Sequence, residues 1–101
     1  MYMSPERILH RPYSFPADIW SLGLVLIEAA TGHYPYPLAE NYIEMAEEIV
    51  GSPEPRITPH INGLSLEFAQ FVASCLHKNP DERLPADILL GLCGNGCIYF
   101  A

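Results

Sequence analysis

The chain has 101 residues, of which half are apolar, 17% are charged and ten are proline. A chain of this length forms one domain, and folding buries somewhat over ~60% of the surface that the unfolded chain exposes. Twelve acidic residues against five basic ones give a formal charge of −7, which repels phosphate backbones and anionic lipids, so nucleic acid and membrane surfaces are excluded as favoured partners.

The first predicted helix follows an irregular start. Residues 1–14 contain two prolines and are expected to be mostly irregular. Ser14 can act as an N-cap and Gly32 as a C-terminal stop, so the pattern predicts a helix over residues 15–31. Apolar residues lie nearly all round this helix, which places it in the middle of the domain with core positions that include Val25 and Ala29.

An acidic amphipathic helix is predicted over Ala39–Val50, after a proline-broken turn at 33–38. Its glutamates point outward. Its inward positions are Tyr42, Ile43, Ala46, Ile49 and Val50. The three prolines and two glycines of residues 51–63 predict an extended connection.

The next predicted helix is capped by Ser65, whose side chain can accept a hydrogen bond from a first-turn amide. Asn79 and Pro80 end this helix, and Pro85 begins a short last helix that runs through Leu90. The apolar residues of the longer helix recur with the period of one buried face: Phe68, Phe71, Val72, Cys75 and Leu76. The expected fold class is therefore all-α.

Several features argue against metal sites, acid–base sites and a membrane or secreted location. Residues 91–101 have no clear period and stay unassigned. The three cysteines are expected to be reduced thiols, since Cys93 and Cys97 have no partners at metal-site spacing. The four histidines stand apart in the sequence and suggest no metal or acid–base site. Without a signal peptide or a membrane-spanning stretch, a cytoplasmic location is expected.

Three short motifs carry the strongest signal. They read Tyr-Met-Ser-Pro-Glu at 2–6, Asp-Ile-Trp-Ser-Leu-Gly at 18–23 and Asn-Pro-Asp-Glu-Arg at 79–83. In order and spacing they resemble the last blocks of a protein kinase domain, and the wording between them is most similar to MAP kinase kinases, plant members above all. The resemblance covers residues 1–90, whereas 91–101 diverge. It implies an all-α partial C-terminal lobe, the end of the activation segment plus about four helices, with the N-terminal lobe absent.

The resemblance also implies supporting roles for four residues. Ser4-Pro5-Glu6 matches the motif that closes the activation segment, and Glu6 is expected to pair with Arg83. A planar guanidinium can meet a carboxylate through two parallel hydrogen bonds. Asp18 matches the aspartate that holds the catalytic loop, although a carboxylate in a first turn is also favoured by the helix dipole alone. Trp20 is expected to pack in the interior.

Three further residues match positions near the protein substrate. Tyr2 and Met3 lie where the resembled family builds the pocket for the residue after the phosphorylated one. Glu28 matches an acidic position that meets a basic substrate residue in some kinases. These residues are possible substrate contacts rather than catalytic groups.

No catalytic, cofactor-binding or metal-binding residue is assigned to this chain. Phosphoryl transfer needs a glycine-rich loop, a lysine on the phosphates, a catalytic aspartate and carboxylates for Mg²⁺. The sequence contains no G-x-G-x-x-G, V-A-I-K, H-R-D or D-F-G. The resemblance therefore implies a complete parent that binds ATP and Mg²⁺, while the 101 residues alone are expected to be inactive.

Two functional hypotheses stay open. In the first, the complete parent phosphorylates threonine and tyrosine in the activation loops of MAP kinases. In the second, the chain is a non-catalytic module that binds a MAP kinase or a scaffold through the helix at 39–50. Because a kinase lobe normally covers the central helix with earlier segments, the isolated chain is expected to self-associate or to need a partner.

Overall fold

The computed structural model describes residues 1–37, 39–59 and 63–85, and within these ranges it contains no strand. The expected all-α fold is confirmed. The elements in chain order are α1 (Pro5–Ile8), α2 (Phe15–Thr31), α3 (Tyr42–Gly51), α4 (Leu66–Cys75) and a 3₁₀ turn η1 (Pro80–Glu82).

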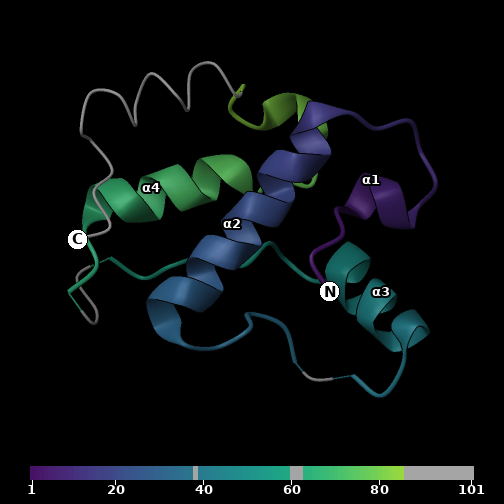
Figure 1. Ribbon diagram of the computed structural model, residues 1–101, viewed down its shortest axis with the longest axis horizontal. Coiled ribbons are helices and arrows are strands. Elements are labelled where there is room, and N and C mark those ends of the chain that lie inside the picture. Colours follow the sequence, from purple (N-terminus) through teal and green to yellow (C-terminus); the bar gives the residue numbers. More distant parts are fainter. Residues whose placement is uncertain (38, 60–62, 86–101) are drawn as a thin grey trace.

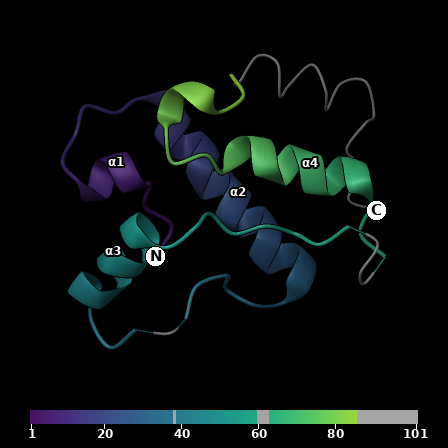
Figure 2. The same cartoon turned by 180° about the vertical axis from the view of Figure 1, so that it is seen from behind.

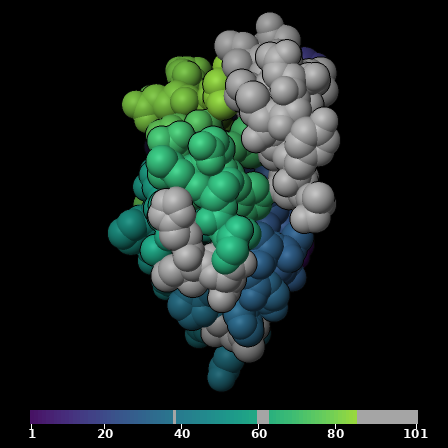
Figure 3. Space-filling view, turned by 90° about the vertical axis from the view of Figure 1, so that its left-hand side faces the viewer, coloured from purple at the N-terminus to yellow at the C-terminus, as the bar shows by residue number. Residues whose placement is uncertain are grey.

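Helix α2 runs through the middle of the molecule, as its composition predicts (Figure 1). Helix α4 crosses it on one side, and η1 lies next to the first turns of α2. Helices α1 and α3 lie beside each other at the opposite end, and the view from behind shows the same arrangement (Figure 2). Seen end-on, α4 forms the near face beside the C-terminal part of α2 (Figure 3).

The main core forms where α2 meets α4. Trp20 and Leu24 of α2 and Val72 and Cys75 of α4 are completely buried. The two helices approach so closely that a Cβ atom added to Gly23 would lie 2.8 Å from Leu76 Cγ. Glycine is therefore required at this crossing, since any side chain would push the helices apart.

The ends of α2 and α4 follow largely from their caps. Gly32 has φ +80° and its amide donates to the Glu28 carbonyl, which confirms the predicted stop. Ser65 accepts a hydrogen bond from the Phe68 amide at 3.1 Å, which confirms the predicted cap of α4. Ser14 occupies the N-cap position of α2, but its side chain makes no capping hydrogen bond.

The mostly irregular start predicted for residues 1–14 is confirmed except for one helical turn, and one predicted helix start was wrong. Ser4 caps the short helix α1 by accepting from the Arg7 amide at 3.4 Å. One turn is too short to show a hydrophobic period. Helix α3 begins at Tyr42 rather than Ala39, because Asn41 accepts from the Glu44 amide at 2.9 Å and sets the start.

The inward face predicted for α3 was also partly wrong. Ile49 is completely buried, and Ala46 and Val50 are half-buried. Tyr42 and Ile43, however, are 51% and 69% exposed. The neighbour of this face is α1, which is a single turn long and cannot cover the first turn of α3.

All five predicted positions are buried, four of them in α4 and Leu76 at its C-cap, but the helix ends at Cys75, four residues before the predicted stop. In a longer helix the Lys78 amide would donate to the Ser74 carbonyl, but that carbonyl accepts from the Leu84 amide at 3.2 Å and the Lys78 amide donates to the Glu54 carboxylate at 3.1 Å. Tertiary contacts thus take both partners of this hydrogen bond, and the helix ends before its proline. The predicted last helix from Pro85 to Leu90 lies outside the described residues beyond Pro85, as does the tail.

One face of α2 stays exposed among the described residues. Phe15 is 76% exposed and Val25 is 47% exposed, and Leu22 and Ala29 follow the same line. We call Phe15, Leu22, Val25 and Ala29 the α2 stripe. The sequence placed Val25 and Ala29 in the core, which is wrong for this chain, because neither α4 nor α3 reaches that side.

Candidate functional site

The Ser-Pro-Glu motif forms the first turn of α1. Ser4 is fully buried and caps the helix, and Pro5 is tolerated at a first-turn position because its missing N–H is not needed there. Glu6 follows in the same turn, where the helix dipole favours a carboxylate, and it is only 4% exposed. A buried charge of this kind requires a partner.

Arg83 supplies that partner from the segment after η1. Its Nη1 and Nη2 donate to the two Glu6 carboxylate oxygens at 2.6 and 2.8 Å. Nε donates to the His77 carbonyl at 2.7 Å, Nη1 also donates to the Pro16 carbonyl at 2.8 Å, and Nη2 to the Lys78 carbonyl at 3.4 Å. All five N–H donors of the guanidinium are therefore used.

The pKa of Glu6 reflects two opposed effects. Burial raises the pKa of the carboxyl, but the hydrogen bonds and positive charge of Arg83 outweigh burial and hold the pKa below its usual range. Glu6 therefore stays ionised at neutral pH. The two charges neutralise each other inside the protein.

Trp20 completes this cluster. Its ring is fully buried and lies beneath the Arg83 guanidinium, 5.2 Å from its Cζ to the ring centroid, a cation–π arrangement. The structure thus brings Glu6, Arg83 and Trp20 together from three segments. Asp18, the fourth predicted support residue, is exposed in the first turn of α2 and has no hydrogen-bond or ion-pair partner within the described residues.

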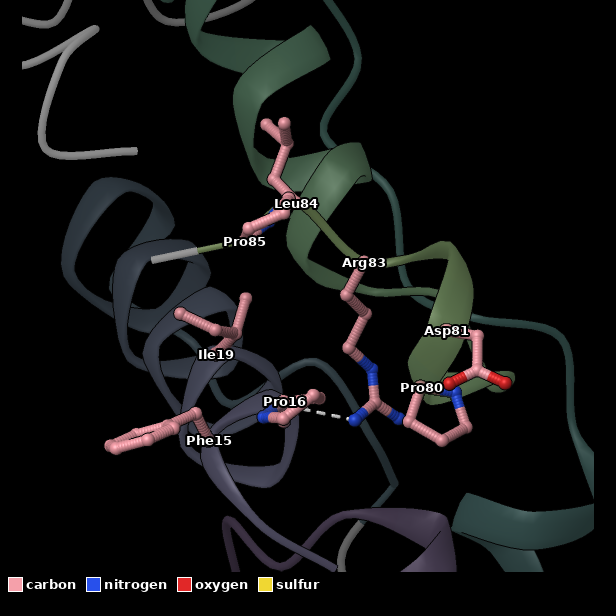
Figure 4. Close-up of a pocket in the computed structure, with 8 residues that line it drawn as sticks. All are labelled: Phe15, Pro16, Ile19, Pro80, Asp81, Arg83, Leu84 and Pro85. Carbon is pink, nitrogen blue, oxygen red and sulfur yellow. Dashed lines mark hydrogen bonds between the residues drawn. The ribbon is translucent and has the colours of Figure 1, made fainter. Parts of the chain in front are cut away.

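A cavity of about 400 Å³ opens beside the guanidinium. Figure 4 shows it between the first turns of α2 and η1, with the hydrogen bond from Arg83 to Pro16 at its edge. Its walls are apolar and include Phe15, Ile19 and Leu84. Apart from Arg83, whose donors are engaged, Asp81 is its charged residue, so the cavity presents no paired acid and base.

The predicted substrate contacts form a second, more exposed cluster. The Tyr2 hydroxyl donates a hydrogen bond to the Glu28 carboxylate, and this bond raises the pKa of Tyr2. Ser21 donates to the Tyr2 carbonyl at 2.7 Å. The N-terminal segment is therefore held on α2 at two points, and Glu28 is already engaged by the chain itself.

Two tyrosines that the sequence analysis did not assign to a functional site extend this cluster. The Tyr34 ring meets the Tyr2 ring edge-to-face at 5.6 Å between centroids, and its hydroxyl donates to the Met1 carbonyl. Burial raises the pKa of Tyr34 to about 12. The Tyr42 hydroxyl lies 3.7 Å from the Met3 sulfur. For Tyr34, the available sequence signal was its place among the aromatic residues and prolines of residues 33–37.

The described residues form no cluster suited to holding a metal ion such as Mg²⁺. Within residues 1–37, 39–59 and 63–85, no group of three or more His, Cys, Asp or Glu side chains is placed to hold a metal ion. The sequence also contains none of the phosphate-binding motifs named above. As a separate finding, none of the helices in the described part is long and apolar enough to cross a membrane.

Comparison with known proteins adds an independent finding. The protein kinase domain family matches residues 1–91. The chain is 49% identical over 89 residues to mitogen-activated protein kinase kinase 3 of Arabidopsis thaliana, which covers 88% of this chain and 17% of that protein.

Two further relatives give the same picture. Identity is 45% over 95 residues to mitogen-activated protein kinase kinase SIPKK of Nicotiana tabacum, covering 88% of this chain and 26% of that protein. It is 39% over 114 residues to dual specificity mitogen-activated protein kinase kinase dSOR1 of Drosophila melanogaster, covering 88% and 28%. The chain therefore spans between 17% and 28% of the length of these relatives.

Proposed function

Since this chain belongs to the protein kinase domain family, and to the MAP kinase kinase type within it, we propose that it serves a longer protein that phosphorylates threonine and tyrosine in the activation loops of MAP kinases. The chain's own part is to anchor the end of the activation segment and to form the platform beside it. A cytoplasmic location stays a prediction.

The observation that carries this proposal is the buried pair of Glu6 and Arg83. It joins two of the three kinase-like motifs across 77 residues of chain. Arg83 is held by backbone carbonyls, and Glu6 lies in helix α1, which Ser4 caps. The segment before Ser4 is therefore attached to a fixed position. A protein substrate needs such a fixed surface, because small displacements of the reacting groups reduce the rate strongly.

The platform is the segment Tyr2–Met3 with the residues that hold it. Ser21 binds its backbone and Glu28 binds the Tyr2 hydroxyl. In this proposal, the substrate residue that follows the phosphorylated residue packs against Tyr2 and Met3. Glu28 then acts by positioning Tyr2, rather than by meeting a basic substrate residue directly.

The phosphate chemistry is assigned to parts outside these 101 residues. ATP supplies the phosphoryl group and Mg²⁺ neutralises its charge in kinases. Because the sequence contains none of the phosphate-binding motifs and the described residues form no metal-holding cluster, the purified 101 residues should neither bind ATP·Mg²⁺ nor transfer phosphate. Saturable binding of ATP·Mg²⁺ in calorimetry at micromolar nucleotide would contradict this assignment.

A chimera tests the proposal directly. Residues 1–90 replace the matching segment of the Arabidopsis relative, to which the chain is 49% identical over 89 residues. The chimera should phosphorylate both the threonine and the tyrosine of a purified plant MAP kinase, measured by mass spectrometry of the activation-loop peptide. The same chimera with Glu6→Gln should lose most of this activity while it still binds ATP.

The matched control replaces Glu67 of α4 by glutamine, because Glu67 is exposed and far from both clusters in the chain. This variant should keep full activity. A folded chimera that binds ATP but phosphorylates neither residue would refute the proposed function.

A second candidate function rests on a different observation. Tyr42 and Ile43 at the start of α3 are largely exposed, although apolar residues of this size usually find a neighbour. The chain could therefore act as a non-catalytic module that holds a MAP kinase or a scaffold through α3. A pull-down of a purified MAP kinase by the 101 residues, with Ile43→Ser as the comparison, tests this candidate.

A further inference from the structure

A surface groove runs between α1 and α3. Its volume is about 420 Å³, and the two helices that form it lie side by side at the end of the molecule opposite α4 (Figures 1 and 2). The walls are almost wholly apolar: Ile8 and Leu9 on the α1 side, and Tyr42, Ile43, Ala46 and Val50 on the α3 side.

The apolar side chains of this groove are unusually exposed. Nine large hydrophobic residues of the described chain are exposed, and three of them, Leu9, Tyr42 and Ile43, line this one groove. Exposed apolar residues scattered singly need no explanation, but a gathered set marks a contact surface. Aromatic and large aliphatic anchors in such a depression are the usual centres of binding energy.

The charged residues on the α3 side of the groove are all negative. Helix α3 carries Glu44, Glu47 and Glu48 and no lysine or arginine. Glu44 accepts from the Glu40 amide and Glu48 from the Ser52 hydroxyl. Glu47 lines the groove and has no hydrogen bond or ion pair within the described ranges. A partner in the groove therefore meets a free carboxylate.

The shape of the groove favours a helical partner. Both of its walls are helices whose amides and carbonyls are largely paired with each other, so the groove offers no strand edge that could pair with an extended peptide. A segment that satisfies its own backbone hydrogen bonds can enter an apolar groove without leaving polar groups unpaired. An amphipathic helix meets both conditions.

We propose that the α1–α3 groove binds an amphipathic helix of another protein, with that helix's apolar face on Ile43 and Leu9 and a lysine or arginine beside Glu47. This deepens the second candidate function, since it names the surface and the chemistry of the partner. It does not depend on phosphate transfer, so its failure and the failure of the chimera are separate results.

The test uses the 101-residue chain and a designed probe. The probe is a fluorescein-labelled 18-residue helical peptide with leucines on one face and lysines on the other, titrated by fluorescence anisotropy. The lysine peptide should bind, and a peptide with glutamates in place of the lysines should bind at least about tenfold more weakly. Ile43→Ser should weaken binding about tenfold, and Glu47→Gln about threefold.

Two matched variants outside the groove serve as controls. Val25→Ser removes an exposed apolar side chain from the α2 stripe, and Glu67→Gln removes an exposed charge from α4. Each should change the dissociation constant by less than about twofold. Circular dichroism should show the same helix content for all four variants, because none of the replaced side chains is buried.

Four outcomes would overturn the proposal. The lysine peptide could fail to bind at about 100 µM chain, or the glutamate peptide could bind equally well. Val25→Ser could weaken binding as much as Ile43→Ser, which would move the site to the α2 stripe. Sedimentation could show a dimer of the chain that Ile43→Ser abolishes, in which case the occupant of the groove is a second copy.

Discussion

The two faces of α2 are made of similar residues and end in different environments. On one face Trp20 and Leu24 are completely buried against α4 and the Arg83 segment. On the other, Phe15, Leu22 and Val25 are exposed among the described residues. The difference teaches that the apolar residues of a helix favour burial on every side, whereas the neighbouring elements decide which side is buried.

The largest effect is expected on the buried face, at the ion pair. Replacing Glu6 by glutamine, or Arg83 by methionine, leaves one buried charge without its partner and should lower the free energy of unfolding by about 3–5 kcal/mol. Urea unfolding followed by circular dichroism, at one fixed protein concentration, measures this loss. The double variant should reveal a coupling energy of at least ~1 kcal/mol, whereas additive losses would mean that the two residues act independently.

Acid should sharpen the same comparison. The folded-state pKa of Glu6 lies below its usual value, so its contribution to stability is present above the unfolded pKa of about 4.3 and is lost as pH falls through the folded pKa. In Arg83→Met both contributions of Arg83 are removed, and burial, the largest single cause, is opposed only by the backbone and Ser4 hydrogen bonds, so the pKa should rise. That variant should instead lose stability as pH rises above about 4.3. Unfolding midpoints between roughly pH 3 and 7 separate the two signs.

The crossing at Gly23 should give an intermediate effect. Gly23→Ala places a Cβ atom 2.8 Å from Leu76 Cγ and 2.9 Å from Cys75 Cβ. Overpacking of about 1–3 kcal/mol exceeds the helix-propensity gain of alanine, which is up to ~1 kcal/mol. Gly51→Ala is the matched control, since nothing lies within 4 Å of its added Cβ. It should be neutral or slightly stabilising, and equal losses at both sites would refute the close approach.

The smallest effect on unfolding is expected on the exposed face. Val25→Ser removes a side chain that is 47% exposed and should change the unfolding free energy by about 0.5 kcal/mol or less. The same variant should reduce self-association of the chain and its binding of a hydrophobic dye. A loss as large as that of Gly23→Ala would show that the α2 stripe is covered after all, and the contrast between the two faces would fail.

The sequence predicted best where local pattern and packing agree. Helix α2 has the predicted bounds, and the five core residues predicted around α4 are buried. The predictions failed where a long-range contact overrides the local pattern. The Leu84 amide takes the Ser74 carbonyl that would have continued α4, and the one-turn helix α1 depends on a single serine cap.

The candidate sites show the same limit. The meeting of Glu6 with Arg83 was predicted because the kinase resemblance names both residues, and no spacing argument alone would have paired them. The tyrosines at 34 and 42 were missed, because their partners Met1 and Met3 lie 33 and 39 residues away in the chain. Such contacts carry no local periodic signal.

The Glu6–Arg83 pair also has a consequence for the order of folding. Its partners are separated by 77 residues, and closing so long a loop is entropically unfavourable until α2 and α4 have already drawn the two ends together. The pair should therefore form late, after the rate-limiting step. Removing it should speed unfolding far more than it slows folding, with a φ-value near zero. The pair then determines the lifetime of the folded state, because it slows unfolding without affecting the rate of folding.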